Sequence, residues 1–597
     1  MESEVLLLRD YATRQINALL WVSLIAITVL LLRKVIRIFR LWSIANLIPG
    51  PPCPSSFYGH STLISGPNLT DLLSKSHEEY GPVVKLWLGP TQLLVSIKDP
   101  ELIKEMLLKA KDKLPLTGRA FHLAFGRSSL FVSSFKEVQK RRDLLATELN
   151  GKLLQRANLI PTKVVDCVME RIQDIMSKGS LDCKMISQHL ACTVLGATLF
   201  GDAFLGWSEA TIYEELLMMI AKDACFWASY SVTPIWNQGF WRYQYLCTKL
   251  KSLTQDIIQQ GRQNYKLFCQ MDQNPHHETR NTVGGAASAA SHSANVVTPD
   301  NIFLQEFDDH VNAREPCGNI MSVMFHGYLT TAGLIGNVLA RLATNPEIQD
   351  KIHSEVIMVR KGSLGQDQQS VKQMLFLLAT VYESARLLPA GPLLQRCSLK
   401  HAKGDKSCLF VTCCKHRCAK KWKKQLLLLL LLLLLLHAER DTQRVLSHGK
   451  SKKKSNALKC VMIPAGAILV VPVQLVQMDD SSWGSDANQF NPYRFLSKAE
   501  KKSNIVNVMP FAEERVDVGQ GTYVLNNPNE NAAFLPFGSG TRACLGQKFV
   551  ILGVATLFAS LLEHYEIRLQ PGSENDPKPM MNQLLPNPKI VFVKRDS

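Results

Sequence analysis

The sequence predicts a mainly α-helical protein with a small β region, preceded by one N-terminal transmembrane helix. Near the N-terminus lies a 17-residue stretch without charge, Ile16–Leu32, which is just long enough for a membrane-spanning helix. Residues 151–270 alternate apolar runs of helical spacing with short breaks, and Pro316–Ala343 is a long apolar segment. Strand-like runs are short, as at Val83–Leu88 and Leu93–Ile97.

The composition fits a large enzyme better than a secreted or nucleic-acid-binding protein. The chain has 597 residues and a net charge of +17, which would suit a nucleic-acid partner. However, residues 401–456 contain 14 Lys or Arg against three acidic residues and supply most of that charge. We therefore expect no nucleic-acid partner. The 15 cysteines are odd in number and have no repeating spacing, which favours reduced thiols over a disulfide framework.

Charge around the first apolar stretch predicts its orientation. Acidic residues dominate before it, and a basic cluster follows it, namely Arg33, Lys34, Arg37 and Arg40. Basic flanks stay on the cytoplasmic side, so the rest of the chain should face the cytosol. A cleaved signal peptide is the alternative, but the acidic N-terminus and the basic flank disfavour it. We expect residues 1–46 to form the anchor and its flank, and Pro49–Pro52 to act as a stiff hinge.

The next part of the chain predicts a short helix, two strands and two more helices. Asn68–Tyr80 has the pattern of an amphipathic helix and precedes the two strand-like runs. Asp99 is a plausible N-cap for a helix that begins at Pro100. Leu114–Val132 is irregular, and Phe135–Leu149 is helical in pattern.

A glycine-rich loop near the C-terminus carries the strongest chemical signal. Glycines such as Gly540 let the backbone approach a large flat partner closely. Arg542 adds a fixed cation suited to a carboxylate. Cys544 lies just before an apolar helical stretch, Gln547–Leu562, and a cysteine beside an arginine at a helix N-terminus exists readily as a thiolate. Such a thiolate can ligate a metal; the alternative is a buried structural cysteine.

This loop resembles the haem-binding signature of cytochromes P450, F-x-x-G-x-R-x-C-x-G. Every fixed position is filled, by Phe537, Gly540, Arg542, Cys544 and Gly546. The resemblance implies a P450 fold that binds haem b between two long helices. It implies that Cys544 is the axial thiolate of the iron, Arg542 a propionate partner and Phe537 a ring near the cysteine. A thiolate ligand pushes electron density toward oxygen and favours O–O cleavage.

The long apolar segment resembles the P450 helix that crosses the haem. Its centre matches the pattern A/G-G-x-D/E-T-T at Gly327, Thr330 and Thr331, but Leu329 replaces the acid and His326 a small residue. The resemblance implies that Gly327 relaxes the helix into a local bulge and that Thr330 donates a hydrogen bond during oxygen activation. Three consequences of the missing acid stay open. His326 or water relays protons in its place, O–O cleavage is slow, or the reaction needs no proton relay. The alternative is ordinary core packing.

A charged pair near the middle of the chain resembles the E-x-x-R motif of the same family. Glu383 and Arg386 are three residues apart, which places them on one helix face. The resemblance implies a structural network with Arg494 that fixes the backbone near the cysteine loop. The family's W-x-x-x-R pattern lacks its tryptophan here, so any of residues 140–142, Lys-Arg-Arg, could reach a haem propionate.

Residues 401–456 do not fit this resemblance. They make the distance between the E-x-x-R motif and Arg494 about twice what the family implies. The eleven-leucine run Leu426–Leu436 is too short to cross about 30 Å of hydrocarbon. The Cys and His spacing lacks the paired two-residue spacers of zinc sites. We interpret the segment as a translated intron or gene-model error, whose removal would join Arg396–Lys400 to Ala457–Gly466 as strand, turn and strand.

Residues 47–597 therefore resemble a eukaryotic microsomal cytochrome P450 of the kind that plants contain. The resemblance implies a monooxygenase that hydroxylates a lipophilic small molecule with O2 and electrons from NADPH through NADPH–cytochrome P450 reductase. It implies a single-pass protein of the endoplasmic reticulum membrane, with Arg141, Arg142 and Lys548 as candidates for the reductase-facing surface. Two alternatives stay open: an isomerase or dehydratase that needs neither O2 nor reductase, and a non-catalytic relative that binds haem poorly.

Overall fold

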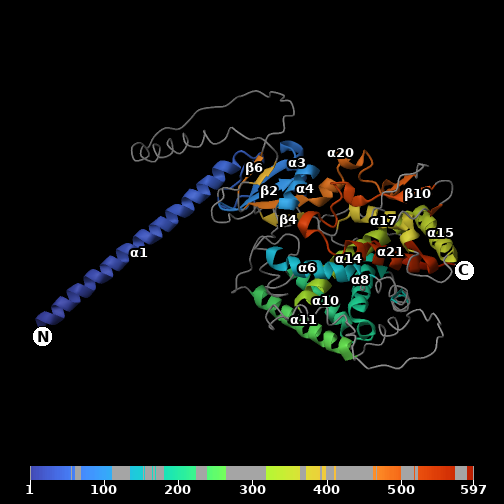
Figure 1. Cartoon of the computed structure of the whole chain (residues 1–597), viewed down its shortest axis with the longest axis horizontal. Helices are drawn as coiled ribbons and strands as arrows, with labels where there is room; N and C mark the ends of the chain where they lie inside the picture. Colours follow the sequence, from blue (N-terminus) through green and yellow to red (C-terminus); the bar gives the residue numbers. More distant parts are fainter. Residues whose placement is uncertain are drawn as a thin grey trace, which may run out of the picture.

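The computed structural model describes the chain in segments, which are residues 2–55, 57–60, 69–109, 135–151, 154, 164–165, 169, 181–223, 238–263, 318–362, 371–389, 393–397, 409–411, 461–464, 467–498, 516–517, 522–571 and 588–595. Within them the chain is mainly helical with small sheets, as the sequence predicts (Figure 1). The irregular stretch Leu114–Val132, the run Leu426–Leu436 and the cysteines at 413–418 lie outside the described residues.

The described helices include the predicted ones, and except for the N-terminal helix their ends lie near the predicted ones. The long helices are α1 (Glu2–Ala45), α3 (Leu69–Tyr80), α4 (Pro100–Lys109), α6 (Phe135–Asn150), α8 (Cys183–Phe200), α10 (Ala210–Asp223), α11 (Gln238–Gln263), α14 (Gly318–Thr344), α15 (Pro346–Gly362), α17 (Leu375–Leu387) and α21 (Gln547–His564). The short ones are α9 (Asp202–Leu205), α19 (Val473–Gln477), α20 (Asp480–Trp483), η1 (Pro492–Phe495), η2 (Pro528–Glu530) and η3 (Gly540–Arg542). Asp99 caps α4 as expected, because its Oδ1 accepts a hydrogen bond of 2.9 Å from Leu102 N.

The described strands form small sheets. One contains β1 (Val83–Trp87), β2 (Leu93–Ile97), β7 (Ile468–Pro472) and β4 (Leu393–Cys397), in the order β1-β2-β7-β4. Two three-stranded sheets have the orders β8-β10-β9, from Leu496–Lys498, Thr522–Leu525 and Val516–Asp517, and β11-β12-β3, from Tyr565–Leu569, Lys589–Lys594 and Leu181–Asp182. The remaining pair is β5 (Leu409–Val411) with β6 (Val461–Ile463).

The β5–β6 pair differs from the predicted hairpin. β4 pairs with β7, so Arg396 belongs to the larger sheet. The partner of β6 is β5, which lies inside the segment interpreted as foreign. The three residues of β5, Leu-Phe-Val, are strong strand formers, which explains why they complete this ladder.

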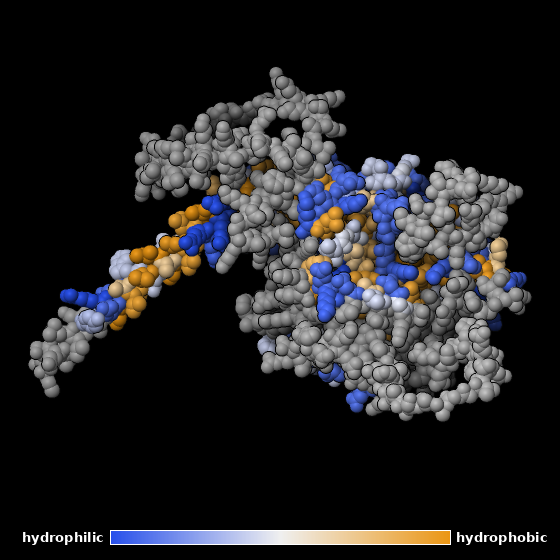
Figure 2. All heavy atoms as spheres, viewed as in Figure 1, coloured by the Kyte–Doolittle hydropathy of each residue, from blue (hydrophilic) through white to orange (hydrophobic). Residues whose placement is uncertain are grey.

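The N-terminal helix is the candidate membrane anchor. α1 extends away from the rest of the molecule as one helix of 44 residues (Figure 1), and its apolar side chains are exposed (Figure 2). Thr13–Ala45 is long and apolar enough to cross a membrane. A second stretch that passes the same test, Ile320–Thr344, is mostly buried in the protein core. α1 is longer than the predicted span because the basic residues after it are good helix formers.

The junction between α1 and the first sheet is held by direct contacts, which lie outside the predicted hinge Pro49–Pro52. Trp42 stacks on Trp87 of β1, with ring centroids 4.3 Å apart and planes 15° apart. Trp42 Nε1 donates to the carbonyl oxygen of Pro90 at 2.8 Å, and Lys85 Nζ donates to that of Ala45 at 2.9 Å, at the end of the helix. These contacts fix where the anchor leaves the sheet.

A buried acid between α15 and α17 predicts a pH dependence of stability. Glu355 accepts hydrogen bonds of 2.9 Å from the backbone N–H groups of Phe376 and Leu377, yet burial raises the pKa of Glu355 to about 7. Between the pKa of Glu355 in the unfolded chain and its raised pKa in the folded protein, the folded state holds one proton more than the unfolded state. The free energy of unfolding therefore falls as pH rises through this range. Burial lowers the pKa values of His60 and His77, and these groups act in the opposite direction.

We therefore expect Glu355→Gln to gain stability relative to wild type as pH rises from about 5 to about 8. Denaturant unfolding of the detergent-solubilised protein measures this difference at each pH. The exposed Glu347 at the start of α15 provides the control Glu347→Gln. A difference between wild type and Glu355→Gln that stays constant across this range would contradict a protonated Glu355.

Candidate functional site

The loop before α21 is closed tightly and depends on glycine at two positions. Gly538 and Gly540 have φ of +68° and +71°, a region that other residues rarely adopt. A Cβ on Gly540 would lie 2.6 Å from the carbonyl oxygen of Leu107 in α4. Gly546, in contrast, has φ of −95°, so its conformation is open to other residues. The loop is closed by a 2.9 Å hydrogen bond from Cys544 N to Phe537 O.

Cys544 differs from the other described cysteines in its exposure. Cys183, Cys192 and Cys247 are buried, whereas the Cys544 side chain is exposed just before α21. Burial raises the pKa of Cys183 and of Cys192, which makes both unsuitable as thiolate ligands. The exposure of Cys544 contradicts the alternative of a buried structural cysteine, and metal ligation by Cys544 stays a prediction.

Three arginines from different parts of the chain are buried around this loop. Arg542 lies in η3 with its guanidinium 5.2 Å from the centre of the Phe135 ring. Arg142 of α6 donates from Nη2 to the carbonyl oxygen of Ala543 at 2.9 Å, which ties α6 to the residue before the cysteine. Arg142 is buried and reaches the loop, whereas Lys140 is exposed; the side chain of Arg141 lies outside the described residues.

Arg396 of β4 is the third arginine, and sequence reasoning missed its role. It is 4% exposed. Burial lowers the pKa of Arg396 to about 10, and the like charges of Arg542 and Arg142 add to this effect. Its Nη1 donates to Gln395 O at 2.8 Å, while its Nε has no hydrogen-bond partner among the described residues. The sequence feature that could have indicated this role is the presence of an arginine within the short strand Leu393–Cys397.

Together the three arginines place buried positive charge close to the cysteine loop, and a multiply charged anion would compensate it. Burying a cation costs several kcal/mol unless an opposite charge compensates it. The orphaned Nε of Arg396 shows that this compensation is incomplete in the protein alone. A flat cofactor with carboxylates, bound beside the Cys544 thiol, would supply the missing acceptors. The residues present therefore fit a haem with propionate groups.

The centre of α14 places the predicted Gly327 and Thr330 on adjacent faces. Thr330 Oγ1 donates to the carbonyl oxygen of His326 at 2.7 Å, so its hydroxyl hydrogen bond stays within the helix. α14 is α-helical throughout, which differs from the expected bulge. Gly327 serves close packing instead, because a Cβ there would lie 3.0 Å from Leu195 Cδ2 of α8. Leu329, at the position of the expected acid, is buried.

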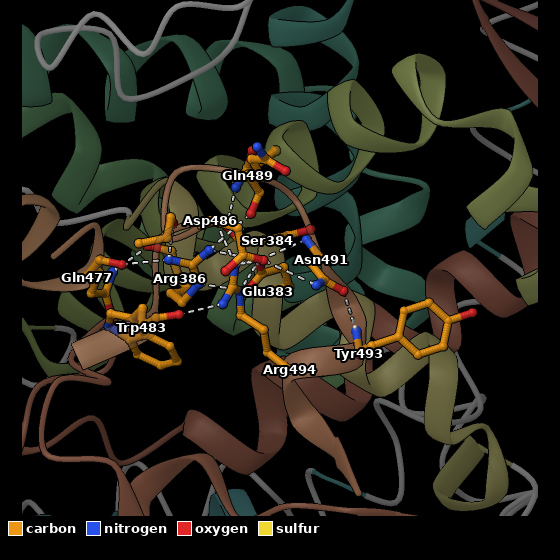
Figure 3. A network of polar contacts seen from close by, with 12 residues as sticks. Glu383, Ser384, Arg386, Gln477, Trp483, Asp486, Gln489, Asn491, Tyr493 and Arg494 are labelled. Atoms are coloured by element: carbon orange, nitrogen blue, oxygen red, sulfur yellow. Dashed lines mark hydrogen bonds and ion pairs between the residues drawn. The ribbon is translucent and has the colours of Figure 1, made fainter. Parts of the chain in front are cut away.

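The predicted network of Glu383, Arg386 and Arg494 forms in full (Figure 3). Glu383 and Arg386 have no exposed side-chain surface and make a two-pronged pair, with N–O distances of 2.7 and 2.8 Å. Arg494 Nε lies 3.4 Å from Glu383 Oε1. Asn491 N also donates to that oxygen, at 2.9 Å. The carboxylate thus joins α17 to the chain around η1.

Both arginines of this network also hold backbone. Arg386 Nη1 donates to Gln477 O and Ala487 O, each at 2.6 Å. Arg494 donates to Trp483 O at 2.6 Å and to Asp486 Oδ2 at 2.6 Å. The hydrogen bond from Arg494 lowers the pKa of Asp486. Most donors of this network are used on carbonyl and carboxylate oxygens of the protein itself, although Arg494 Nε makes its 3.4 Å ion pair without a hydrogen bond. The network therefore fits the structural role that the sequence implied.

Gln477 connects this network to the cysteine loop. Its side chain is buried, Nε2 donates to Arg386 O at 2.6 Å, and Oε1 accepts from Leu535 N at 2.9 Å. Leu535 lies two residues before Phe537, at the entry to the loop. A single buried amide therefore positions the loop relative to α17.

We expect Gln477→Leu to destabilise the protein by about 2 kcal/mol or more, because it leaves a buried N–H and a buried C=O without partners. Gln477→His retains one donor and one acceptor and should recover much of the loss. Chemical denaturation of the two variants beside wild type measures the effect. Equal stability of Gln477→Leu and wild type would show that the bridge contributes nothing.

Comparisons with known proteins agree with this geometry. Residues 49–405 and 446–595 match the Cytochrome P450 family. Similar proteins include the cytokinin hydroxylase of Arabidopsis thaliana, 21% identical over 84% of this chain and 79% of the relative. The 11-oxo-beta-amyrin 30-oxidase of Glycyrrhiza uralensis is 22% identical over 85% and 79%. Cytochrome P450 3A18 of Rattus norvegicus is 20% identical over 87% and 86%.

The family match covers most of the chain and includes the cysteine loop, the three arginines and the Glu383 network. Family membership implies a haem-iron cofactor and the oxidation of small molecules by a monooxygenase. The relatives named as a hydroxylase and an oxidase have the same general activity. The chain belongs to the cytochrome P450 family, as a monooxygenase of the eukaryotic, plant-like kind.

Proposed function

We propose that this protein is a membrane-bound haem-thiolate monooxygenase that hydroxylates a lipophilic small molecule. In this proposal, electrons come from NADPH through NADPH–cytochrome P450 reductase, and O2 is the oxidant. The observation that carries the proposal is the exposed Cys544 at the start of α21 beside three buried arginines, one with an orphaned Nε. A thiolate beside a group of cations suits the iron and the propionates of one haem.

Each site residue has a distinct part in this proposal. Cys544 ligates the iron, and Arg142, Arg396 and Arg542 bind the propionates. A thiolate-ligated haem supplies the activation of oxygen. Phe537 and Gly540 shape the loop so that the thiol stays exposed. On α14, the Thr330 hydroxyl donates to His326 O in the haem-free protein, and it would have to leave that acceptor to donate a proton at the haem.

The anchor supports a lipophilic substrate and a membrane location. α1 is apolar and exposed over most of its length, and its contacts with β1 hold the catalytic part close to the membrane surface. The basic residues after the apolar stretch favour a cytosolic catalytic part on a single-pass protein of the endoplasmic reticulum. For the reductase-facing surface, Arg142 was a wrong candidate, since it is buried. Lys548 is half-buried.

Turnover with a defined redox partner tests the proposal. The purified full-length protein is incubated with reductase, NADPH and a panel of lipophilic compounds, and hydroxylated products are measured by mass spectrometry. We expect products that depend on NADPH, reductase and O2 and that disappear in Cys544→Ser. Haem-loaded protein that shows no reductase-dependent oxidation of any compound, while oxidising one without NADPH, would contradict the proposal.

A second candidate function is favoured by one observation. Leu329 is buried where the family pattern has an acid, which removes a usual route for protons. An isomerase or dehydratase acting on a peroxide needs no such route. The same assay separates the two functions, because a peroxide substrate would then be converted without NADPH and reductase.

We further propose that most of residues 401–456 is foreign to the catalytic part. The family match omits residues 406–445, which supports this interpretation for that part, although the match includes residues 401–405 and 446–456. β5 lies inside the omitted part but pairs with β6, so we keep it with the fold. Removal of residues 412–456 would join β5 to β6 through residues 457–460, a length common in hairpins.

We expect the variant without residues 412–456 to incorporate haem at least as well as the full chain. Removal of all of 401–456 also deletes β5 and should incorporate less. Haem content per purified protein measures both. A loss of haem on removal of 412–456 alone would contradict the interpretation.

A further inference from the structure

We propose that the imidazole of His326 coordinates the haem iron on the side opposite Cys544 in the resting protein. This inference rests on the proposed haem site and goes beyond it, because it assigns a second protein ligand. It follows from which neighbours the faces of α14 contact, and from the position of His326 one helical turn before Thr330, which the proposed function places at the haem.

Two faces of α14 point away from the loop. Gly327 faces Leu195 of α8, since a Cβ there would lie 3.0 Å from Leu195 Cδ2. Tyr328 is buried and donates from its hydroxyl to Glu214 Oε1 of α10 at 3.4 Å. Residues 327 and 328 are therefore committed to α8 and α10.

The opposite face of α14 points toward α17. Asn337 Nδ2 donates to the carbonyl oxygen of Ser384 in α17. His326 precedes Asn337 by eleven residues and Thr330 precedes it by seven. These separations are close to about three and about two turns of α-helix, so the three side chains share one face. The helix that this face meets is the one whose Arg386 is joined to the cysteine loop through Gln477.

The chemistry of His326 at this place differs from that of a small residue. The His326 carbonyl oxygen accepts from Thr330 Oγ1 at 2.7 Å, which ties the two residues together one turn apart. An imidazole nitrogen is the commonest protein ligand for a metal. If Thr330 lies over the haem, the His326 ring lies on the same face and reaches the same space.

Coordination by His326 would make oxygen binding conditional. The bond forms when the imidazole lone pair is donated to the iron, with no change in oxidation state and no net proton transfer from a neutral ring. This bond must break before O2 binds, so substrate entry would have to displace the ring. The apparent affinity for any external ligand falls in proportion to the fraction of iron left open.

The test compares the full-length, haem-loaded protein with His326→Ala and His326→Gln. Ferric absorption and electron paramagnetic resonance spectra are recorded, followed by titration with free imidazole. We expect wild type to show a nitrogen–thiolate, low-spin spectrum and both variants to lose it. Free imidazole should restore this spectrum in the variants and bind to them at least about tenfold more tightly than to wild type.

The control is His189→Ala, because His189 lies on α8 and pairs with Glu214 at 3.3 Å; it should behave as wild type. Identical ferric spectra and imidazole affinities in wild type and both His326 variants, with the reduced-CO thiolate band present, would overturn this inference alone. Absence of the thiolate band from all proteins would overturn the proposed haem site and this inference with it.

Discussion

Replacing Arg386 by methionine is expected to destabilise the protein by about 3–5 kcal/mol, because it leaves the carboxylate of Glu383 buried without its main partner. Arg386 also donates to three backbone carbonyl oxygens, those of Gln477, Ala487 and Gln489. A loss of this size is a large part of the stability of a typical protein. Urea unfolding of the detergent-solubilised protein measures it, and the yield of folded protein should fall as well.

The matched control is an exposed ion pair of the same kind. Arg568 pairs with Glu566 at 2.7 Å, with 58% of the arginine side chain exposed. Arg568→Met should change the stability far less than Arg386→Met does, because solvent screens an exposed ion pair. An Arg386→Met variant as stable as Arg568→Met would show that the buried network does not hold the chain around the cysteine loop.

Replacing Arg396 by methionine is expected to have opposite effects on the protein with and without haem. Removing a buried, incompletely paired cation should stabilise the haem-free protein by about 1–3 kcal/mol. The same change removes a charge-assisted partner of the propionates. Haem affinity should therefore fall by a factor of about 10–100, equivalent to about 1.4–2.8 kcal/mol.

Two measurements on the same preparations separate these effects. Denaturant unfolding of the haem-free protein gives the first, and haem titration gives the second. Lys140→Met on the exposed side of α6 is the control and should change neither. If Arg396→Met lowers the stability of the haem-free protein and leaves haem affinity unchanged, Arg396 has a structural role and does not bind a propionate.

The residues predicted correctly from sequence were those encoded by local patterns. The turn at Gly538 and Gly540 requires glycine, and the three-residue spacing of Glu383 and Arg386 fixes their common face. Helix ends such as that at Asp99 followed from capping rules. Local sequence was therefore sufficient for the helices, for the first two strands and for the cysteine loop.

The residues that sequence reasoning missed depend on distant parts of the chain. Arg396 joins Arg142 and Arg542 only because β4, α6 and the loop before α21 meet in space. Gln477 bridges Arg386 and Leu535 for the same reason. Gly327 appeared to be a place for a bulge, but the approach of Leu195 from α8 decides its role. A single sequence can mark such a residue as unusual, as it does for Arg396 within a short strand, but it does not show which distant residues the side chain meets.

The proposed thiolate ligation is tested most directly by the reduced-CO difference spectrum of the full-length protein beside its Cys544→Ser variant. Serine keeps the size of the side chain but provides no thiolate. We expect a thiolate-type Soret band in wild type and its loss in the variant, at equal protein concentration. A band that persists in Cys544→Ser, or a haem-loaded wild type without this band, would contradict ligation by Cys544.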